Sequence, residues 1–93
     1  MNDVTKHATE VIERYRMKAG VPKSEVARRL DMTRETLSRG LNQSREFTFF
    51  EIALLAAYFN IPLSELFDTN AILRAMPEAT AKMLVEDKQK GRG

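Results

Sequence analysis

Apolar residues recur every three or four positions along the first twenty residues, which is the spacing of one face of an α-helix. These positions are Val4, Ala8, Val11, Ile12, Tyr15 and Ala19. Asp3 or Thr5 can cap the start of this helix, and Gly20 follows its end, where a positive φ is favourable. No alternation of apolar and polar residues typical of a strand occurs along the chain. The pattern therefore predicts an all-α protein whose first helix ends at Ala19.

Two shorter helices are predicted next, over residues 23–30 and 34–41, with a three-residue turn at 31–33 between them. Their apolar residues share one face of each helix, and these are Val26, Ala27, Leu30, Leu37 and Leu41. At about 100° per residue, another arc of the second helix is polar and holds Arg34, Glu35, Ser38 and Arg39. A helix held by its apolar edge can present such an arc to another molecule.

A fourth helix is predicted from the Thr48 cap to about Phe59, because Thr48 and Glu51 have the T-x-x-E spacing of a capping box. Pro62 then suits the first turn of a short helix over residues 63–67. The pattern weakens after this point, and these two helices close the compact part of the chain.

Residues 1–68 are therefore expected to form one domain and residues 69–93 a helical C-terminal extension. This extension has a helical turn or two at 71–76, a last helix at about 78–89 and a frayed tail. The segment 49–59 is apolar nearly all round, whereas a helix packed on one side needs only a stripe. Either the extension covers the rest of this helix or a second copy of the chain does, and both covers can hold together.

The composition fits a single domain of 93 residues with a modest core. Cysteine is absent, which excludes disulfides and thiolate metal sites. Residues 13–45 carry nine Lys or Arg against four acids, while residues 46–68 carry four acids and no Lys or Arg. This basic segment, residues 13–45, contains the two short helices, where binding to phosphates would need positive charge. The N-terminus lacks the apolar region of a signal peptide, and the longest apolar run, 52–59, is too short to span a bilayer.

Catalytic chemistry is not expected. The sequence has no visible nucleophile–base pair, metal-ligand cluster or glycine-rich phosphate loop. His7 is the only histidine, and we interpret it as a surface residue of the first helix. We therefore expect neither an enzyme nor a bound cofactor or metal.

Two stretches, VPKSEVARRLDMTRETLSRGLNQ and FTFFEIALLAAYFNIPLSELF, resemble the Cro/repressor family of phage and bacterial helix-turn-helix regulators. The resemblance covers roughly residues 5–67. It implies an all-α, lambda-repressor-like bundle of about five short helices, here with a helical C-terminal extension. Ala27 falls where the family favours a small residue, and Met32 and Leu37 fall at its buried turn and recognition-helix positions.

Three positions depart from the family pattern. Asp31 stands where the turn usually has glycine, although aspartate tolerates the left-handed conformation better than most residues. Lys23 stands where glutamine often begins the helix. Gly40 replaces a bulky apolar residue, although glycine inside a helix costs about 1 kcal/mol relative to alanine. Either the helix ends at Gly40 or another part of the backbone approaches it closely.

The resemblance also implies which residues contact DNA. Base readers in the major groove would be Arg34, Glu35, Thr36, Ser38 and Arg39. Phosphate contacts would come from Lys23, Thr33, Asn42 and Arg45. Two roles stay open: Glu35 either reads a base or orients Arg39 four residues on, and Thr33 either binds phosphate or only caps its helix.

The sequence therefore predicts a cytoplasmic, sequence-specific regulator that binds a double-stranded DNA operator as a homodimer. Within the family it would be a phage or prophage repressor or a Cro-like protein. The alternative is the antitoxin of a toxin–antitoxin pair, which would bind DNA and also a protein toxin through its C-terminal segment. No membrane partner is expected.

Overall fold

The computed structural model describes residues 3–75, which form six helices and no strand. The helices are α1 (Asp3–Ala19), α2 (Lys23–Arg29), α3 (Arg34–Leu41), α4 (Phe49–Phe59), α5 (Leu63–Leu66) and α6 (Thr69–Ala75). The predicted all-α class is confirmed. The predicted end of the first helix and both bounds of the next four hold to within one residue, and α1 begins at Asp3, one of the two candidate caps. α6 begins earlier than the turn or two predicted at 71–76. The helix predicted at 78–89 lies outside the described residues.

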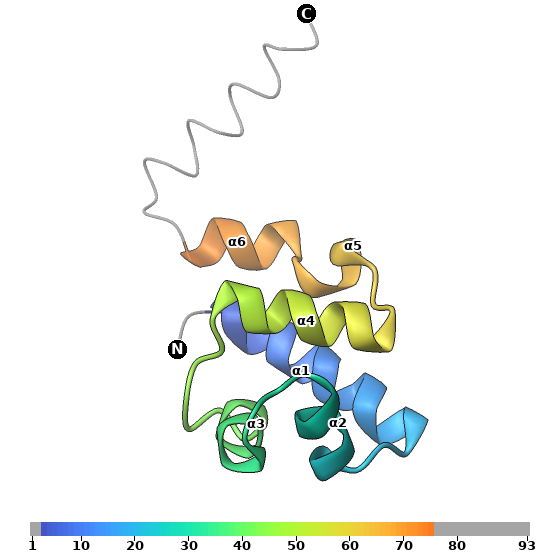
Figure 1. Ribbon diagram of the computed structural model, residues 1–93. Helices are drawn as coiled ribbons and strands as arrows, with labels where there is room; N and C mark the ends of the chain where they lie inside the picture. The colour runs from blue at the N-terminus through green and yellow to red at the C-terminus, as the bar shows by residue number, and fades with distance from the viewer. Residues whose placement is uncertain (1–2, 76–93) are drawn as a thin grey trace, which may run out of the picture.

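The long helix α1 organises the fold, because α3, α4, α5 and α6 all pack against it. In Figure 1, α2 and α3 lie together at one end of the molecule, α5 and α6 lie at the other, and α1 and α4 lie between them. The predicted stripe of α1 supplies the buried side chains Ala8, Val11 and Ile12. Ala19 was predicted to face inward, but it is exposed in the last turn before Gly20.

Local sequence signals place the helix ends. Thr48 and Glu51 form the predicted capping box at the start of α4, with the side chain of each accepting from the backbone N–H of the other. Gly20 ends α1 with a φ of 69°, and Asn60 ends α4 with a φ of 55°. Both residue types adopt the left-handed conformation at low cost. None of the helices in residues 3–75 is long and apolar enough to cross a membrane.

Close packing explains the glycine at position 40. α3 does not end there but continues to Leu41, and Gly40 is buried. A Cβ atom on Gly40 would lie 2.1 Å from Cζ of Phe47, whose ring is itself buried. Of the two explanations left open by the sequence, close approach is therefore right, although a side chain makes the approach and not the backbone.

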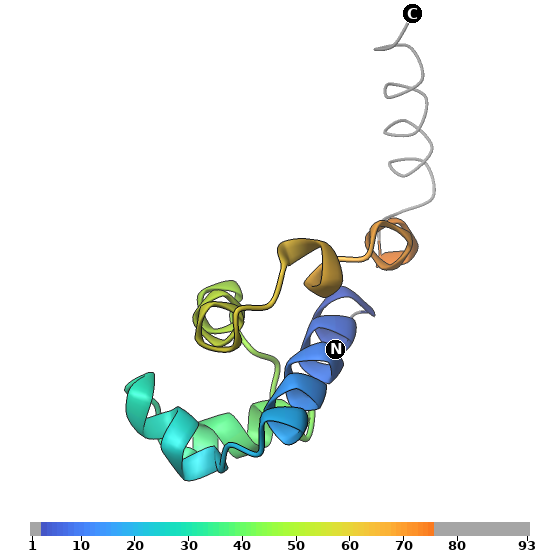
Figure 2. The same cartoon turned by 90° about the vertical axis from the view of Figure 1, so that its right-hand side faces the viewer.

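One face of α4 is largely exposed within the described residues, although Phe49 at its start stacks on Phe67 with ring centroids 5.9 Å apart. Phe49 and Phe50 are 72% and 69% exposed, and Ala53 and Ala57 on the same arc are also exposed. Figure 2 shows α5 (gold) between α4 (yellow-green) and α6 (orange), and α6 packs on α1 instead. The described part of the C-terminal extension therefore leaves this arc open.

Candidate nucleic-acid interface

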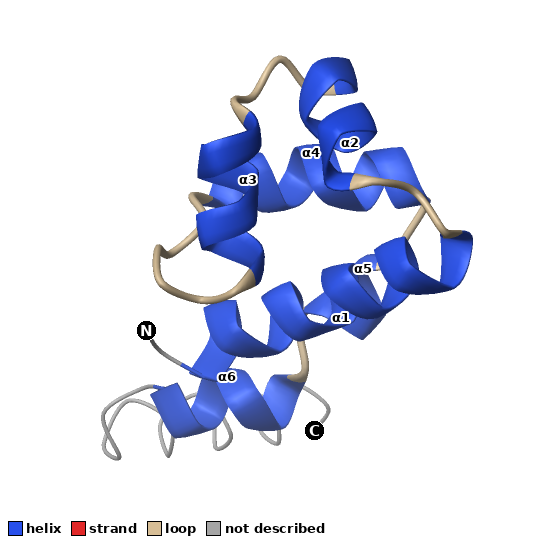
Figure 3. Cartoon of the chain, turned by 90° about the horizontal axis from the view of Figure 1, so that it is seen from below, coloured by secondary structure: helices blue, strands red, loops and turns tan. Residues whose placement is uncertain are grey.

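The two short helices α2 and α3 pack against each other as one unit (Figure 3). Val26 and Ala27 of α2 and Leu37 of α3 are buried at their contact with the core. The turn is closed by the Met32 N–H, which donates to the Ala27 carbonyl at 2.9 Å. Asp31 adopts a φ of 53°, the left-handed conformation that the glycine of related sequences would adopt. The sequence-predicted helix-turn-helix is therefore present.

The outward arc of α3 carries most of the predicted base readers. Arg34, Glu35 and Arg39 are exposed, and Ser38 beside them is half-buried. The inward arc holds Leu37, Gly40 and Leu41, all buried. The core thus fixes the rotation of α3 about its axis, so that two arginines and an acid face solvent together.

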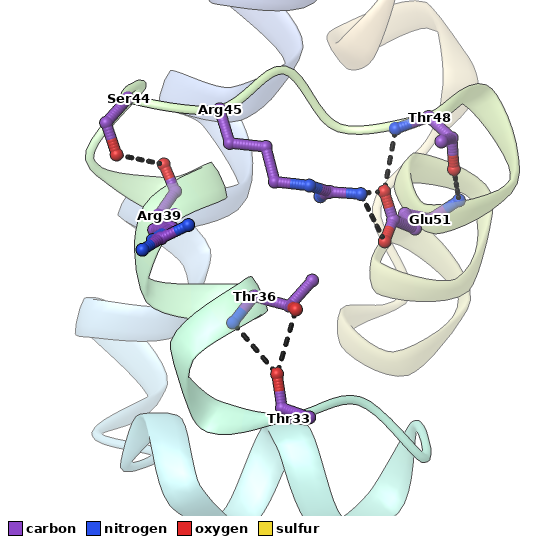
Figure 4. A network of polar contacts seen from close by, with 7 residues as sticks. All are labelled: Thr33, Thr36, Arg39, Ser44, Arg45, Thr48 and Glu51. Carbon is purple, nitrogen blue, oxygen red and sulfur yellow. Dashed lines mark hydrogen bonds and ion pairs between the residues drawn. The ribbon is translucent and has the colours of Figure 1, made fainter.

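Thr36, the fifth predicted base reader, has a different setting. Its side chain is half-buried at the start of α3, and its hydroxyl oxygen accepts from the Thr33 hydroxyl at 2.8 Å. The Thr36 backbone N–H donates to the same Thr33 oxygen at 3.0 Å (Figure 4). Thr33 therefore caps α3, and its hydroxyl also donates to the Thr36 hydroxyl.

Glu35 and Arg39 form an ion pair with an N–O distance of 2.7 Å across one helical turn. Both side chains remain largely exposed, so the pair lies on the outward arc itself. This geometry matches the second of the roles left open for Glu35, which is to orient the Arg39 guanidinium. Arg34 at the start of α3 forms no ion pair with any residue in the described range 3–75.

Two of the predicted phosphate contacts, Lys23 and Asn42, lie at helix ends, whereas a third, Arg45, lies in an ion pair. Lys23 begins α2 and is half-buried, while Asn42 is exposed just after α3. The Asn42 side-chain oxygen accepts from both the backbone N–H and the hydroxyl of Ser44, which holds the loop in place. Arg45, in contrast, has its guanidinium bound to both carboxylate oxygens of Glu51, at 3.0 and 3.2 Å.

Glu51 is the residue that sequence reasoning missed at this site. The T-x-x-E spacing had assigned it to the helix cap alone, and it does accept from the Thr48 backbone N–H at 2.8 Å. Its second role depends on the loop after α3 folding back toward α4. No helical spacing links positions 45 and 51, so only the loop conformation reveals the pair.

Other cations of the basic segment are also paired. Glu25 binds Arg28 and Arg29 on the exposed face of α2, at 2.9 and 3.0 Å. Hydrogen bonds first from Arg28 and then from Arg29 hold the pKa of Glu25 below its usual range. Both arginines are exposed.

His7 joins two helices of the fold. Its Nε2 atom lies 2.9 Å from the backbone oxygen of Glu65, so α1 and α5 are linked at this point. Across residues 3–75, no cluster of three His, Cys, Asp or Glu side chains could hold a metal ion.

Comparison with known proteins adds one match. A family model described as helix-turn-helix matches residues 12–66, which is more than half of the chain. This range runs from α1 to the last residue of α5 and includes all of the predicted contact residues. No significant match was found among curated proteins or among solved structures.

Proposed function

The chain belongs to the Cro/repressor type of helix-turn-helix DNA-binding regulators, and on that premise we propose that it represses transcription by occupying a specific operator. In this role it would be a phage or prophage repressor or a Cro-like protein, acting in the cytoplasm of a bacterial host. The observation that carries the proposal is the outward arc of α3. Arg34 and Arg39 are exposed on this arc, while the opposite side of the helix is buried in the core.

In the proposed complex, the N-terminal half of α3 enters the major groove. Arg34 can bond both O6 and N7 of a guanine, and Arg39 can do the same with its guanidinium oriented by Glu35. Ser38 lies between them on the arc, and the Thr36 methyl can contact a thymine. Lys23, Thr33 and Asn42 lie at helix ends, where they can fix the register on the phosphates.

Replacing Arg34 by alanine should cost roughly 1–3 kcal/mol of binding free energy on the cognate site and relax preference at one base pair. Lys23→Ala should instead weaken cognate and random DNA by the same factor, because phosphate contacts carry no sequence information. Fluorescence anisotropy with both DNAs measures the two ratios. Equal losses on both DNAs for Arg34→Ala would show that Arg34 does not read a base.

The uncovered arc of α4 supports a homodimer as part of the same proposal. Phe49, Phe50, Ala53 and Ala57 form an apolar strip that carries no charge, and the exposed Leu63 of α5 follows it in sequence. Contiguous apolar surface of this kind is typical of interaction sites. A two-fold pair built on α4 and α5, with the 69–93 extension contributing, would present two copies of α3 to inverted half-sites.

Phe50→Asp should abolish this dimer, because a carboxylate would be buried without a partner at its centre. Met17→Asp is the matched control, since Met17 is 66% exposed on α1 and should leave assembly unchanged. Light scattering reports the mass of each variant. If the unmodified chain were a monomer with a non-palindromic footprint, the homodimer would be refuted.

A further inference from the structure

A bidentate ion pair between Arg45 and Glu51 connects the loop after α3 to the start of α4. The two terminal nitrogens of Arg45 bind the two carboxylate oxygens of Glu51, in the bidentate arrangement that makes Arg–carboxylate pairs strong and directional. The Arg45 side chain is 35% exposed and the Glu51 side chain only 15% exposed. Figure 4 shows the guanidinium reaching across from the loop to the first turn of α4.

Glu51 is held as a charged partner for Arg45. Burial alone raises the pKa of the Glu51 carboxyl, but hydrogen bonds from the Thr48 backbone and the Arg45 guanidinium outweigh it, so that the pKa lies below its usual range. At neutral pH the carboxylate is therefore ionised. The Arg45–Glu51 pair carries no net charge, although Arg45 lies in the basic segment.

The backbone of the same loop is bound to the recognition helix. The backbone N–H groups of Ser44 and Arg45 both donate to the Arg39 carbonyl, at 3.0 and 3.2 Å. The Ser44 hydroxyl donates to that carbonyl as well, at 3.3 Å. Arg45 therefore links two elements: its backbone N–H binds the Arg39 carbonyl of α3, and its guanidinium binds Glu51 in the capped first turn of α4.

These contacts bear on which cations of the chain would bind DNA phosphates and which would position a base-reading residue. The inference rests on the proposed function. We propose that Arg45 is a positioning residue whose charge Glu51 withholds from DNA. The pair fixes the loop and the C-terminal turn of α3 against α4, so that Arg39 meets its base in register. Phosphate neutralisation is then left to cations outside such pairs, of which Lys23 is one.

The salt dependence of DNA binding separates this role from that of a phosphate clamp. Each phosphate neutralised by a Lys or Arg contributes about −0.9 to the slope of log K against log salt concentration. Four full-length proteins are compared on random and cognate DNA: the unmodified chain, Glu51→Gln, Arg45→Met with Glu51→Gln, and the control Lys23→Met. Glutamine at position 51 retains an oxygen for the Thr48 N–H, so the helix cap survives.

Glu51→Gln should free the Arg45 charge, steepen the slope by about 0.9 and raise random-DNA affinity. The double variant replaces one neutral pair by another, so its slope and random-DNA affinity should match those of the unmodified chain. Its cognate affinity should fall roughly tenfold, the size of one lost base contact. Lys23→Met should make the slope shallower by about 0.9. Melting curves establish that each variant is folded at the assay temperature.

A double variant whose slope is as shallow as that of Lys23→Met would show that Arg45 contacts phosphate, and would overturn the inference. A Glu51→Gln variant with unchanged slope and random-DNA affinity would overturn it too, because no charge would have been released. Both results leave the proposed function intact. An unmodified chain that binds DNA without salt dependence would overturn the proposed function, and this inference with it.

Discussion

Replacing Leu37 by alanine should lower the free energy of unfolding by roughly 2–5 kcal/mol, the usual range for a leucine removed from a core. Leu37 is fully buried on the inward side of α3, within the cluster that also contains Val26 and Ile12. A small domain has only about 5–15 kcal/mol of stability in total. The variant should therefore be partly or largely unfolded at physiological temperature.

Chemical denaturation followed by circular dichroism measures this loss, with Met17→Ala as the control. Met17 is a large apolar residue on the surface of α1, and its truncation should change stability by no more than about 0.5 kcal/mol. DNA binding by Leu37→Ala should fall with the folded fraction, while base preference stays the same. An unchanged melting temperature would show that Leu37 does not hold α3 to the core.

Gly40→Ala should destabilise the domain by roughly 1–3 kcal/mol, the cost of overpacking a core. Alanine favours a helix over glycine by about 1 kcal/mol, so helix propensity alone predicts the opposite sign. The added Cβ would lie 2.1 Å from Cζ and 2.2 Å from Cε1 of Phe47. Because the Phe47 ring is buried, it cannot swing aside into solvent.

A second substitution tests that the ring causes the loss. Phe47→Leu alone should destabilise the domain through the cavity it leaves. In the Gly40→Ala background the same change should cost less, because leucine makes room for the new methyl group. The stabilities of the two single variants and the double variant form a mutant cycle. Additive effects, or a more stable Gly40→Ala protein, would contradict the close contact between these two positions.

The helices were predictable because their signals are local. The apolar faces of α2 and α3, the Thr33 cap and the Thr48–Glu51 box each depend on residues at most one helical turn apart. The tolerance of aspartate for positive φ likewise accounts for Asp31 in the turn. The Glu35–Arg39 pair has the same character, since residues four apart on a helix are neighbours.

Features that depend on the path of the loop after α3 were not predictable. The sequence left two explanations open for Gly40, and only the position of the Phe47 ring decides between them. Arg45 was predicted as a phosphate contact from its place in the motif, and its ion pair with Glu51 depends on the path of the loop. The apolar arc of α4 was visible in the sequence, whereas its exposure depends on α6 packing against α1.

Selection of bound sequences from a random DNA pool tests the central claim, operator recognition by α3, most directly. The account predicts a palindromic consensus with a guanine in each half-site and half-site centres about one helical turn, ~34 Å, or a multiple of it, apart. The guanine preference should weaken in a parallel selection with Arg34→Ala. A pool that shows no enrichment over the starting library, with folded protein at saturating concentration, would contradict sequence-specific DNA recognition by this chain.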